Sequence, residues 1–276
     1  MEKSRYQSHY LAALEAVQMG RACLLGYFGK INRIEVKEKA GLVSEADREC
    51  ENLMKAHLAK LHPEVDFLGE ETSHLNHVES FKSVKGARWI LDPLDGTTNY
   101  IHQFPIFCIS LALEVDGQIE IGIIDMPVLN QTWTTLRGEG TFCNGAKVSV
   151  SKTENFSDAL LSTGFFAEEP AFLDEQLDIF SKLVRIARGI RRPGAAAYDL
   201  ALVSSGIFDL FWEKNLKPWD TAAGQLLVEE AGGVVKTYEG TPHSPFEKSI
   251  VAGNPILVEK FLAEIRHLRK PSKTVL

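Results

Sequence analysis

The chain has 276 residues, 45% of them hydrophobic, and its 30 basic and 37 acidic residues give a net charge of −7 at pH 7. A chain of this length buries roughly three quarters of its extended surface on folding, so a disulfide-stapled miniprotein is excluded. The near-average apolar content and the modest net charge exclude a disordered chain. The acidic balance argues against sequence-independent binding to nucleic acid, which depends on clustered Lys and Arg.

The four cysteines have no paired short spacing, so neither a zinc site nor a redox pair is expected. One dense basic run, residues 185–192, is interpreted as a solvated helix face. The first residues show no signal-peptide pattern, and no apolar run approaches the length of about 18 residues that a membrane helix needs. These features predict a cytoplasmic protein without a membrane partner.

The first half of the chain begins with helical patterns and continues with β-prone runs. Apolar spacing predicts an amphipathic helix over 6–28 and a second helix from Asp47 to Pro63. Short runs rich in β-branched and aromatic residues follow, at 65–68, 88–91, 107–115, 119–125, 131–136 and 147–150. We expect a mostly antiparallel sheet with helices on one face.

The second half alternates strands and helices, as α/β units do. Strands are predicted at 160–163, 208–212 and 233–236, and helices at 170–188, 195–205, 220–231 and 255–268. No repeat or flexible linker separates the halves. We therefore expect a single compact unit over 1–276, with an α+β half (about 1–150), an α/β half (about 151–276) and the site at their junction.

Four acidic clusters stand where a strand ends or a helix begins, positions that direct side chains into a crevice. They are Asp47, Glu70 with Glu71, Asp92 with Asp95, and Asp220. Each has a structural alternative, since Asp47 and Asp220 could cap helices and Asp95 with Gly96 could form a turn.

The segment around Asp92 is harder to explain by turns alone. Residues 89–91 run as a buried strand into Asp92, and Pro93 should end the pairing because proline has no N–H. Asp95 follows three residues later and can turn toward the same point, which leaves the Leu94 carbonyl free. Carboxylates with a backbone carbonyl are the oxygen ligands that Mg²⁺ or Mn²⁺ prefers.

Three predicted helix starts lie near these carboxylates. Residues 96–97 open a short helix whose first N–H groups have no internal partner and can bind an anion. The same reasoning applies at 219–224, where Asp220 begins a helix of small residues, and at 194–196.

Two segments resemble the signatures of the inositol monophosphatase family of magnesium-dependent, lithium-sensitive sugar-phosphate phosphatases. They are residues 92–97 (DPLDGT) and 219–233 (WDTAAGQLLVEEAGG). Residues 69–71 (GEE) and 42–47 (LVSEAD) resemble the family's other two acidic motifs. The four motifs stand in the family's order, and the resemblance spans residues 37–253. It implies a layered αβαβα sandwich of the inositol monophosphatase and fructose-1,6-bisphosphatase type.

The resemblance also implies a metal centre of two or three Mg²⁺ ions, with Mn²⁺ as a substitute. Glu70, Asp92 and the Leu94 carbonyl would bind the first ion. Asp92, Asp95 and Asp220 would hold the second, and a third, weaker ion would lie near Glu70. Such cations would explain how an acidic protein binds an anionic substrate.

The remaining roles follow from the same resemblance. Glu70, Thr97 and Asp47 would be catalytic, the Thr97 hydroxyl and Asp47 helping to activate a metal-bound water. The amides of Gly96 and Thr97 would hold the phosphate. An inositol-like substrate would meet Asp95, Gly194, Ala195, Ala196 and Glu213.

The function implied is hydrolysis of a small polyol or sugar monophosphate, with inositol 1-phosphate as the expected substrate. A fructose 1,6-bisphosphate or nucleotide-bisphosphate phosphatase of the same fold, or a non-catalytic metal-dependent regulatory protein, stays open. Ala195 stands where many members carry Ser or Thr, which leaves the identity of the alcohol open. We expect a homodimer that binds a small phosphorylated substrate and no nucleic acid.

Overall fold

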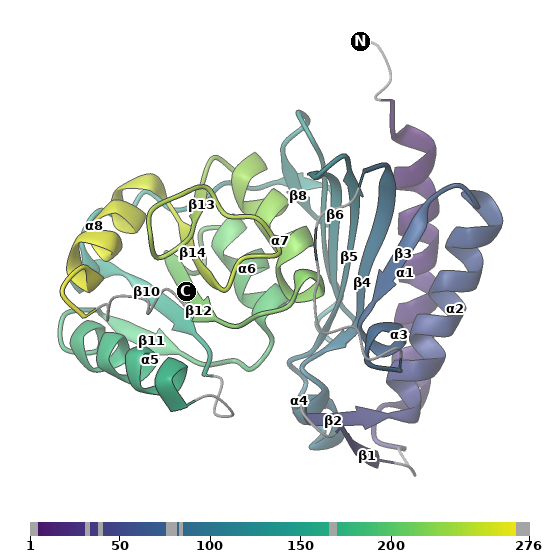
Figure 1. The fold of residues 1–276 in the computed structure, drawn as a ribbon, viewed down its shortest axis with the longest axis horizontal. Helices are drawn as coiled ribbons and strands as arrows, with labels where there is room; N and C mark the ends of the chain where they lie inside the picture. Colours follow the sequence, from purple (N-terminus) through teal and green to yellow (C-terminus); the bar gives the residue numbers. More distant parts are fainter. Residues whose placement is uncertain are drawn as a thin grey trace, which may run out of the picture.

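Five layers of helices and sheets make up the fold in the computed structural model, which describes residues 5–30, 34–37, 41–75, 82, 85–165 and 170–268. Helices α1 (Gln7–Tyr27) and α2 (Glu45–Leu61) form one outer layer, and α5 (Pro170–Leu183) and α8 (Pro255–Ile265) form the other. Helices α6 (Ala196–Ser204) and α7 (Pro218–Glu230) lie between the two main sheets (Figure 1). The predicted αβαβα sandwich is confirmed.

The first main sheet has seven strands in the order β3-β4-β5-β6-β7-β8-β9. Their bounds are β3 (Asp66–Gly69), β4 (Ala87–Asp95), β5 (Cys108–Val115), β6 (Gln118–Met126), β7 (Gln131–Leu136), β8 (Thr141–Cys143) and β9 (Ala146–Lys147). Only the β3–β4 pair is parallel. The predicted strand at 147–150 is wrong beyond Lys147, because the Val148 and Val150 N–H groups donate to carbonyls of Thr141 and Ala231.

Helices cover both faces of this sheet, so the expectation of helices on one face is wrong. Side chains alternate across a strand, and in β4 Ile90 packs into the core with α6 and α7 whereas Trp89 and Leu91 pack into the core with α1 and α2. A strand buried on both faces reads as a continuous apolar run rather than as an alternation. The apolar residues 89–91 therefore gave no alternation from which the covering of the two faces could be predicted.

The second main sheet has five strands in the order β11-β10-β12-β14-β13. They are β10 (Leu160–Thr163), β11 (Gly189–Arg191), β12 (Leu210–Lys214), β13 (Val234–Lys236) and β14 (Ser249–Gly253). Strand β10 runs parallel to β11 and β12, whereas β14 is antiparallel to its neighbours. Strands β11 and β14 were not predicted. The basic run 185–192 is not one helix face, because α5 ends at Leu183 and part of the run forms β11.

Short elements complete the chain. They are strands β1 (Ile34–Lys37) and β2 (Gly41–Ser44), which form a hairpin, helices α3 (Glu70–Leu75) and α4 (Thr97–Ile101), and the 3₁₀ helix η1 (Phe156–Asp158). None of the helices in the described ranges combines the length and the hydropathy that crossing a membrane requires.

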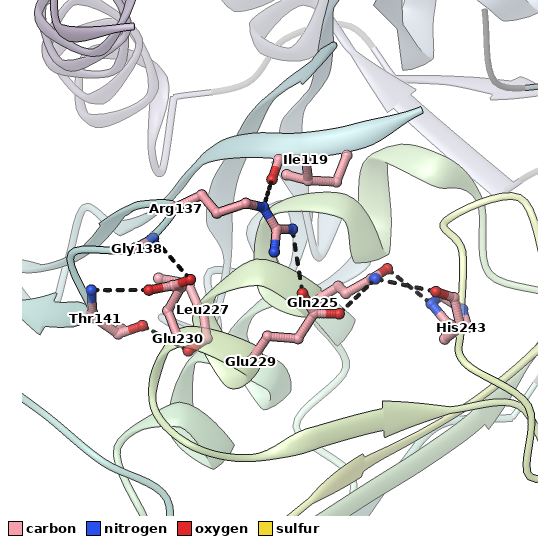
Figure 2. Close-up of polar contacts among 10 residues, drawn as sticks. Ile119, Arg137, Gly138, Thr141, Gln225, Leu227, Glu229, Glu230 and His243 are labelled. Carbon is pink, nitrogen blue, oxygen red and sulfur yellow. Dashed lines mark hydrogen bonds and ion pairs between the residues drawn. The ribbon is translucent and has the colours of Figure 1, made fainter. Parts of the chain in front are cut away.

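Helix α7 is bonded to the seven-stranded sheet by side-chain and backbone contacts near its C-terminal end (Figure 2). The Glu230 carboxylate accepts the N–H groups of Gly138 and Gly140, both at 3.0 Å. Arg137 donates to Glu229 at 3.3 Å, and the Thr141 hydroxyl donates to the Leu227 carbonyl at 2.7 Å. These contacts fix α7, and with it Asp220, relative to the ends of the sheet strands.

Candidate metal and substrate site

An irregularity near the end of β4 brings two carboxylates to the same edge of the sheet. The predicted end of pairing at Pro93 is wrong, because the register only shifts there: Asp92 lies opposite Ser110 and Asp95 lies opposite Cys108. Proline removes one donor, and the Leu94 N–H turns to Asp92 Oδ1 at 2.9 Å instead of joining the ladder. The bulge therefore presents Asp92 and Asp95 on neighbouring positions with the Leu94 carbonyl between them.

Four predicted metal ligands interact electrostatically at this edge. Burial raises the pKa of Asp92 well above its ordinary value, and the charges of Glu70, Asp95 and Asp220 raise it further. Burial likewise raises the pKa of Asp220 well above its ordinary value, with Asp95 and Glu70 adding to the effect. Carboxylates that repel one another in a buried position are stabilised by a cation. The all-oxygen donor set fits Mg²⁺.

Backbone N–H groups orient Asp95 and Asp220, as the Leu94 N–H orients Asp92. Burial raises the pKa of Asp95 to about 7, even though the Ala197 N–H donates to Asp95 Oδ2 at 2.7 Å and opposes the rise. The Lys217 N–H donates to Asp220 Oδ2 at 2.6 Å. The structural alternative for Asp220 is thus partly realised, since the same carboxylate that faces the site also satisfies the first turn of α7.

Glu51 supports the segment that carries Glu70, and the sequence reasoning missed it. Its carboxylate accepts the Glu71 N–H at 2.8 Å and the Thr72 N–H at 2.7 Å, and it also accepts the Thr72 hydroxyl. These bonds satisfy the first turn of α3, which begins at Glu70. One signal was available: Glu51 follows Asp47 by four residues and so lies on the same, inward face of α2.

The Thr97 hydroxyl lies between two acceptors. Its Oγ1 is 3.1 Å from Asp47 Oδ1 and 3.1 Å from the Leu94 carbonyl oxygen. A hydroxyl has one hydrogen, so it donates to one acceptor at a time and its oxygen keeps lone pairs for a further donor. Gly96 precedes it with φ +93°, and a Cβ there would meet the Ile106 carbonyl at 3.0 Å, so only glycine fits this turn.

A cavity of about 140 Å³ adjoins these groups. All five predicted substrate-binding residues line it: Asp95, Gly194, Ala195, Ala196 and Glu213. Asp220 also lines it, so the cavity and the metal-ligand group share Asp95 and Asp220. The other predicted residues, Asp47, Glu70, Asp92, Leu94, Gly96 and Thr97, lie outside the lining of this cavity. Side chains of residues 42–44, the start of the first acidic motif, are outside the described part of the chain.

Elements of the second sheet and helix α6 shape the cavity. The Glu213 carboxylate at the end of β12 lies against Gly164, where a Cβ would collide with it. Burial raises the pKa of Glu213 to about 8, with the charge of Asp220 adding to the rise and Arg192 opposing it. The Asn99 amide donates to the Pro193 carbonyl at 2.9 Å and so ties the turn before α6 to α4.

Two charged residues of the lining, Arg192 and Asp199, were not predicted from the sequence, and neither were the uncharged Thr163, Gly164 and Leu216. Arg192 belongs to the basic run that was interpreted as a solvated helix face. Asp199 lies within helix α6, which is buried along its length. The one feature of the sequence that pointed to it is that a charged residue stands among apolar ones over 195–203.

Comparisons with known proteins agree with this architecture over nearly the whole chain. A model of the inositol monophosphatase family matches residues 6–270. The chain is 39% identical over 267 residues to the Nus factor SuhB of Pseudomonas aeruginosa, across 94% of this chain and 96% of that protein. It is also 39% identical over 267 residues to an inositol-1-monophosphatase of Rhizobium meliloti, with the same coverage. The crystal structure of extragenic suppressor protein suhB from Bartonella henselae matches with a TM-score of 0.84 and 36% identity, over 95% of this chain and 98% of that one.

Proposed function

The chain belongs to the inositol monophosphatase family, and from this premise we propose that it is a Mg²⁺-dependent phosphomonoesterase for a small polyol or sugar monophosphate, foremost inositol 1-phosphate. The observation that carries the proposal is the group of mutually repelling carboxylates beside a small polar cavity. Asp92, Asp95 and Asp220, with Glu70, offer only oxygen ligands, and an anionic phosphate could not approach them without cations.

The proposed metal ligands are Glu70, Asp92, the Leu94 carbonyl, Asp95 and Asp220, for two or three Mg²⁺ ions or for Mn²⁺ in their place. When bound, two such ions would lower the pKa of an attacking water and neutralise charge on the phosphate and the leaving oxygen. Phosphate-monoester hydrolysis is among the slowest uncatalysed reactions, so this electrostatic contribution must be large.

The protein's own groups would position the reactants. The Thr97 hydroxyl, while donating to Asp47, can accept a hydrogen from a water and so orient it toward the phosphorus. The N–H groups of Gly96 and Thr97 would donate to phosphate oxygens. Glu213, Gly194, Ala195 and Ala196 would contact the alcohol part of the substrate, because they line the cavity with Asp95.

A panel of phosphomonoesters, assayed for kcat/KM with Mg²⁺, with chelator and with Li⁺, tests this proposal. Asp95→Asn and Asp220→Asn are each expected to lower kcat at least about 100-fold, because each removes a charged ligand. Asp178→Asn, on the exposed side of α5, is the matched control and should retain activity. Turnover that survives exhaustive chelation would rule out the metal requirement, and unchanged rates in both ligand variants would rule out the ligand assignment.

Phosphatases of the same fold that act on other phosphate esters are the nearest alternatives. The panel therefore includes fructose 1,6-bisphosphate and a nucleotide bisphosphate, and a higher kcat/KM for either than for inositol 1-phosphate would reassign the substrate. If the protein is an inositol phosphatase, Li⁺ is expected to inhibit its hydrolysis of inositol 1-phosphate.

A regulatory, non-catalytic function is the second candidate, and the 39% identity to a protein named Nus factor SuhB favours it. Retention of Glu70, Asp92, Asp95, Thr97 and Asp220 favours catalysis, since a scaffold would not need all of them. Failure to hydrolyse any ester on the panel, by a folded and Mg²⁺-binding protein, would favour the regulatory function.

We also propose a cytoplasmic homodimer whose partner is a small phosphorylated molecule rather than nucleic acid or a membrane. The net charge of −7 disfavours contact with a phosphate backbone. Light scattering coupled to size exclusion would test the dimer, and titration with RNA and DNA at physiological salt would test the nucleic-acid statement.

A further inference from the structure

Three side chains with metal-binding groups meet where the start of α1 lies beside the end of α2. His9 lies in the first turn of α1, and His62 and Glu64 follow directly after α2. Asp47 of the proposed catalytic centre lies in the first turn of α2, at the opposite end of the helix. At about 1.5 Å per residue the 17 residues of α2 span about 25 Å, so the cluster is well separated from that centre.

The ligand atoms of this cluster lie near the separations that a tetrahedral metal ion requires. One oxygen, Glu64 Oε1, is 3.2 Å from His62 Nδ1 and 3.7 Å from His9 Nε2. One ligand atom from each of the three residues lies within 4.8 Å of the other two. In a tetrahedral zinc site with bonds of about 2.0–2.2 Å, the ligand atoms are about 3.3–3.6 Å apart. The Glu64 side chain is 63% exposed, so its carboxylate can rotate to complete this geometry.

The two imidazole rings are already ordered beside one another. Their centroids are 3.8 Å apart and their planes differ by 19°. The ring of His9 also packs near Tyr6 and Trp89, with centroid distances of 5.8 and 6.1 Å. A tilt of the stacked rings would direct one nitrogen of each toward a common point. Because packing has fixed most of the side-chain freedom beforehand, an ion that binds here loses little affinity to ordering.

The charge states of the cluster favour a bound cation over a pair of ordinary ion pairs. Burial lowers the pKa of His9, and the neighbouring His62 lowers it further, against the opposing effect of Glu64. A hydrogen bond with its own backbone N–H lowers the pKa of the Glu64 carboxyl, and the bond with His62 adds to this. At neutral pH His9 is therefore a neutral imidazole and Glu64 a carboxylate, the forms in which these side chains bind metal ions.

Two imidazoles and one carboxylate favour a transition-metal ion. Imidazole nitrogen suits Zn²⁺, whereas Mg²⁺ prefers oxygen ligands. Two His and one Glu form a known ligand set of zinc, in which a water takes the fourth position. The Ser8 hydroxyl lies 3.5 Å from His9 Nδ1 and can support the second nitrogen of that ring. The spacing of the cysteines could not reveal this site, because its ligands are His and Glu side chains from two distant segments.

We propose that His9, His62 and Glu64 bind a Zn²⁺ ion that joins the start of α1 to the end of α2, at a site separate from the proposed Mg²⁺ centre. The inference does not depend on the proposed function, because no group of the phosphatase site takes part. An ion that binds the native state and not the unfolded chain stabilises the fold. Its role is structural, since it fixes α1 against α2 in the layer that packs on the seven-stranded sheet.

Zn²⁺ binding by the tag-free protein in excess Mg²⁺, measured by isothermal titration calorimetry, tests the inference. His9→Gln and His62→Gln are each expected to weaken Zn²⁺ binding at least about 100-fold, because loss of even an outer partner of a metal ligand costs about 10- to 100-fold. Zn²⁺ at about 100 times its Kd should raise the Tm of the unmodified protein by several °C. The same Zn²⁺ concentration should not raise the Tm of either variant.

His57→Gln is the matched control. His57 Nε2 lies 3.1 Å from Glu15 Oε2 in another contact between α2 and α1, and these side chains are 19% and 62% exposed, close to the values for His9 and Glu64. This pair contains a single imidazole, so its loss should leave Zn²⁺ binding and the rise in Tm unchanged. Glu64→Gln, at an exposed position, should weaken Zn²⁺ binding at least about tenfold.

Electron paramagnetic resonance of bound Cu²⁺ identifies the ligand atoms. Cu²⁺ binds nitrogen and oxygen ligands more tightly than Zn²⁺, and imidazole nitrogens split its signal whereas carboxylate oxygens do not. Couplings from two nitrogens in the unmodified protein and in His57→Gln, reduced in His9→Gln and His62→Gln, support the inference. A signal without nitrogen couplings, an absence of Zn²⁺ binding, or equal Zn²⁺ binding in all variants would overturn it. Unfolding curves without metal show whether each variant folds, and Glu64→Gln decides the result if a histidine variant does not.

Discussion

Glu51 connects helix α2 to the start of α3 and therefore controls where Glu70 lies. Its carboxylate accepts the N–H groups of Glu71 and Thr72. Glu51→Ala leaves these donors unpaired, and we expect it to lower the free energy of unfolding by about 1–3 kcal/mol. Because residues that orient metal ligands affect affinity, the Mg²⁺ concentration for half-maximal activity should rise about 10- to 100-fold. Mg²⁺ titrations of activity and of thermal unfolding measure both effects.

Glu51→Gln should have a smaller effect, because its amide oxygen still accepts a backbone N–H. Glu154→Gln, at an exposed position, is the matched control. An unchanged Mg²⁺ requirement in Glu51→Ala would show that Glu70 does not depend on this support.

The sequence predicted site residues whose position is set by local backbone structure. Asp92 and Asp95 lie at the irregular end of β4 and Asp220 lies in the first turn of α7, so the spacing of the motifs was enough to identify them as candidates. Glu51 and Asp199 reach the site only through tertiary packing. Glu51 contacts a segment 20 residues along the chain, and Asp199 lies on a helix buried between two sheets. The helical spacing from Asp47 places Glu51 on the inward face of α2, but no pattern in a single sequence shows which distant segment it contacts.

At the scale of elements, helices α6 and α7 pack closely because Gly224 of α7 has no side chain where it faces Leu200 of α6. A Cβ at Gly224 would lie 2.5 Å from Leu200 Cβ, so alanine there must separate the two helices. We expect Gly224→Ala to lower the free energy of unfolding by about 1–3 kcal/mol through overpacking. Activity should fall too, because α6 carries Asp199 and α7 carries Asp220. Denaturant unfolding and kcat/KM measure the two effects.

Gly26 is the matched control within another helix, since a Cβ there would meet nothing within 4 Å. Gly26→Ala is expected to be neutral or to stabilise by about 0.4–1 kcal/mol, because alanine restricts the unfolded chain. Equal effects of the two substitutions would mean that helix propensity, and not the contact with Leu200, decides the result.

Long elements were predicted well and short ones were not. Helix α2 repeats apolar residues at a period near 3.6, and α1 is a long run of good helix formers without proline, so both were predicted. Strand β14 (Ser249–Gly253) is buried at every position, and β11 has only three residues, so neither shows an alternation. The layered sandwich itself was inferred from family resemblance, because local periodicity alone led to a sheet covered on one face.

At the scale of the whole molecule, the site draws its residues from both main sheets and from the helices between them. Asp92 and Asp95 come from β4, Asp220 comes from α7, and Glu213 comes from β12. Contacts such as those of Glu230 with the N–H groups of Gly138 and Gly140 hold the C-terminal end of α7 on the first sheet (Figure 2). Bound cations would add a second connection at the other end of α7, so metal binding and global stability should be coupled.

This coupling gives the stability a defined pH dependence. Burial raises the pKa of Asp95 from 3.8 to about 7 and that of Glu213 from 4.5 to about 8. These two carboxyl groups therefore bind more protons in the native state than in the unfolded chain, and their contribution to the stability of the metal-free protein should fall as the pH rises from about 4 to about 8. Mg²⁺ offsets the repulsion of the ionised carboxylates, so it should raise Tm by several °C more at pH 8 than at pH 5. Scanning calorimetry at both pH values, with Mg²⁺ and with chelator, measures the difference. Asp220→Asn should reduce it, Asp178→Asn should not, and an equal Mg²⁺ effect at both pH values would refute the coupling.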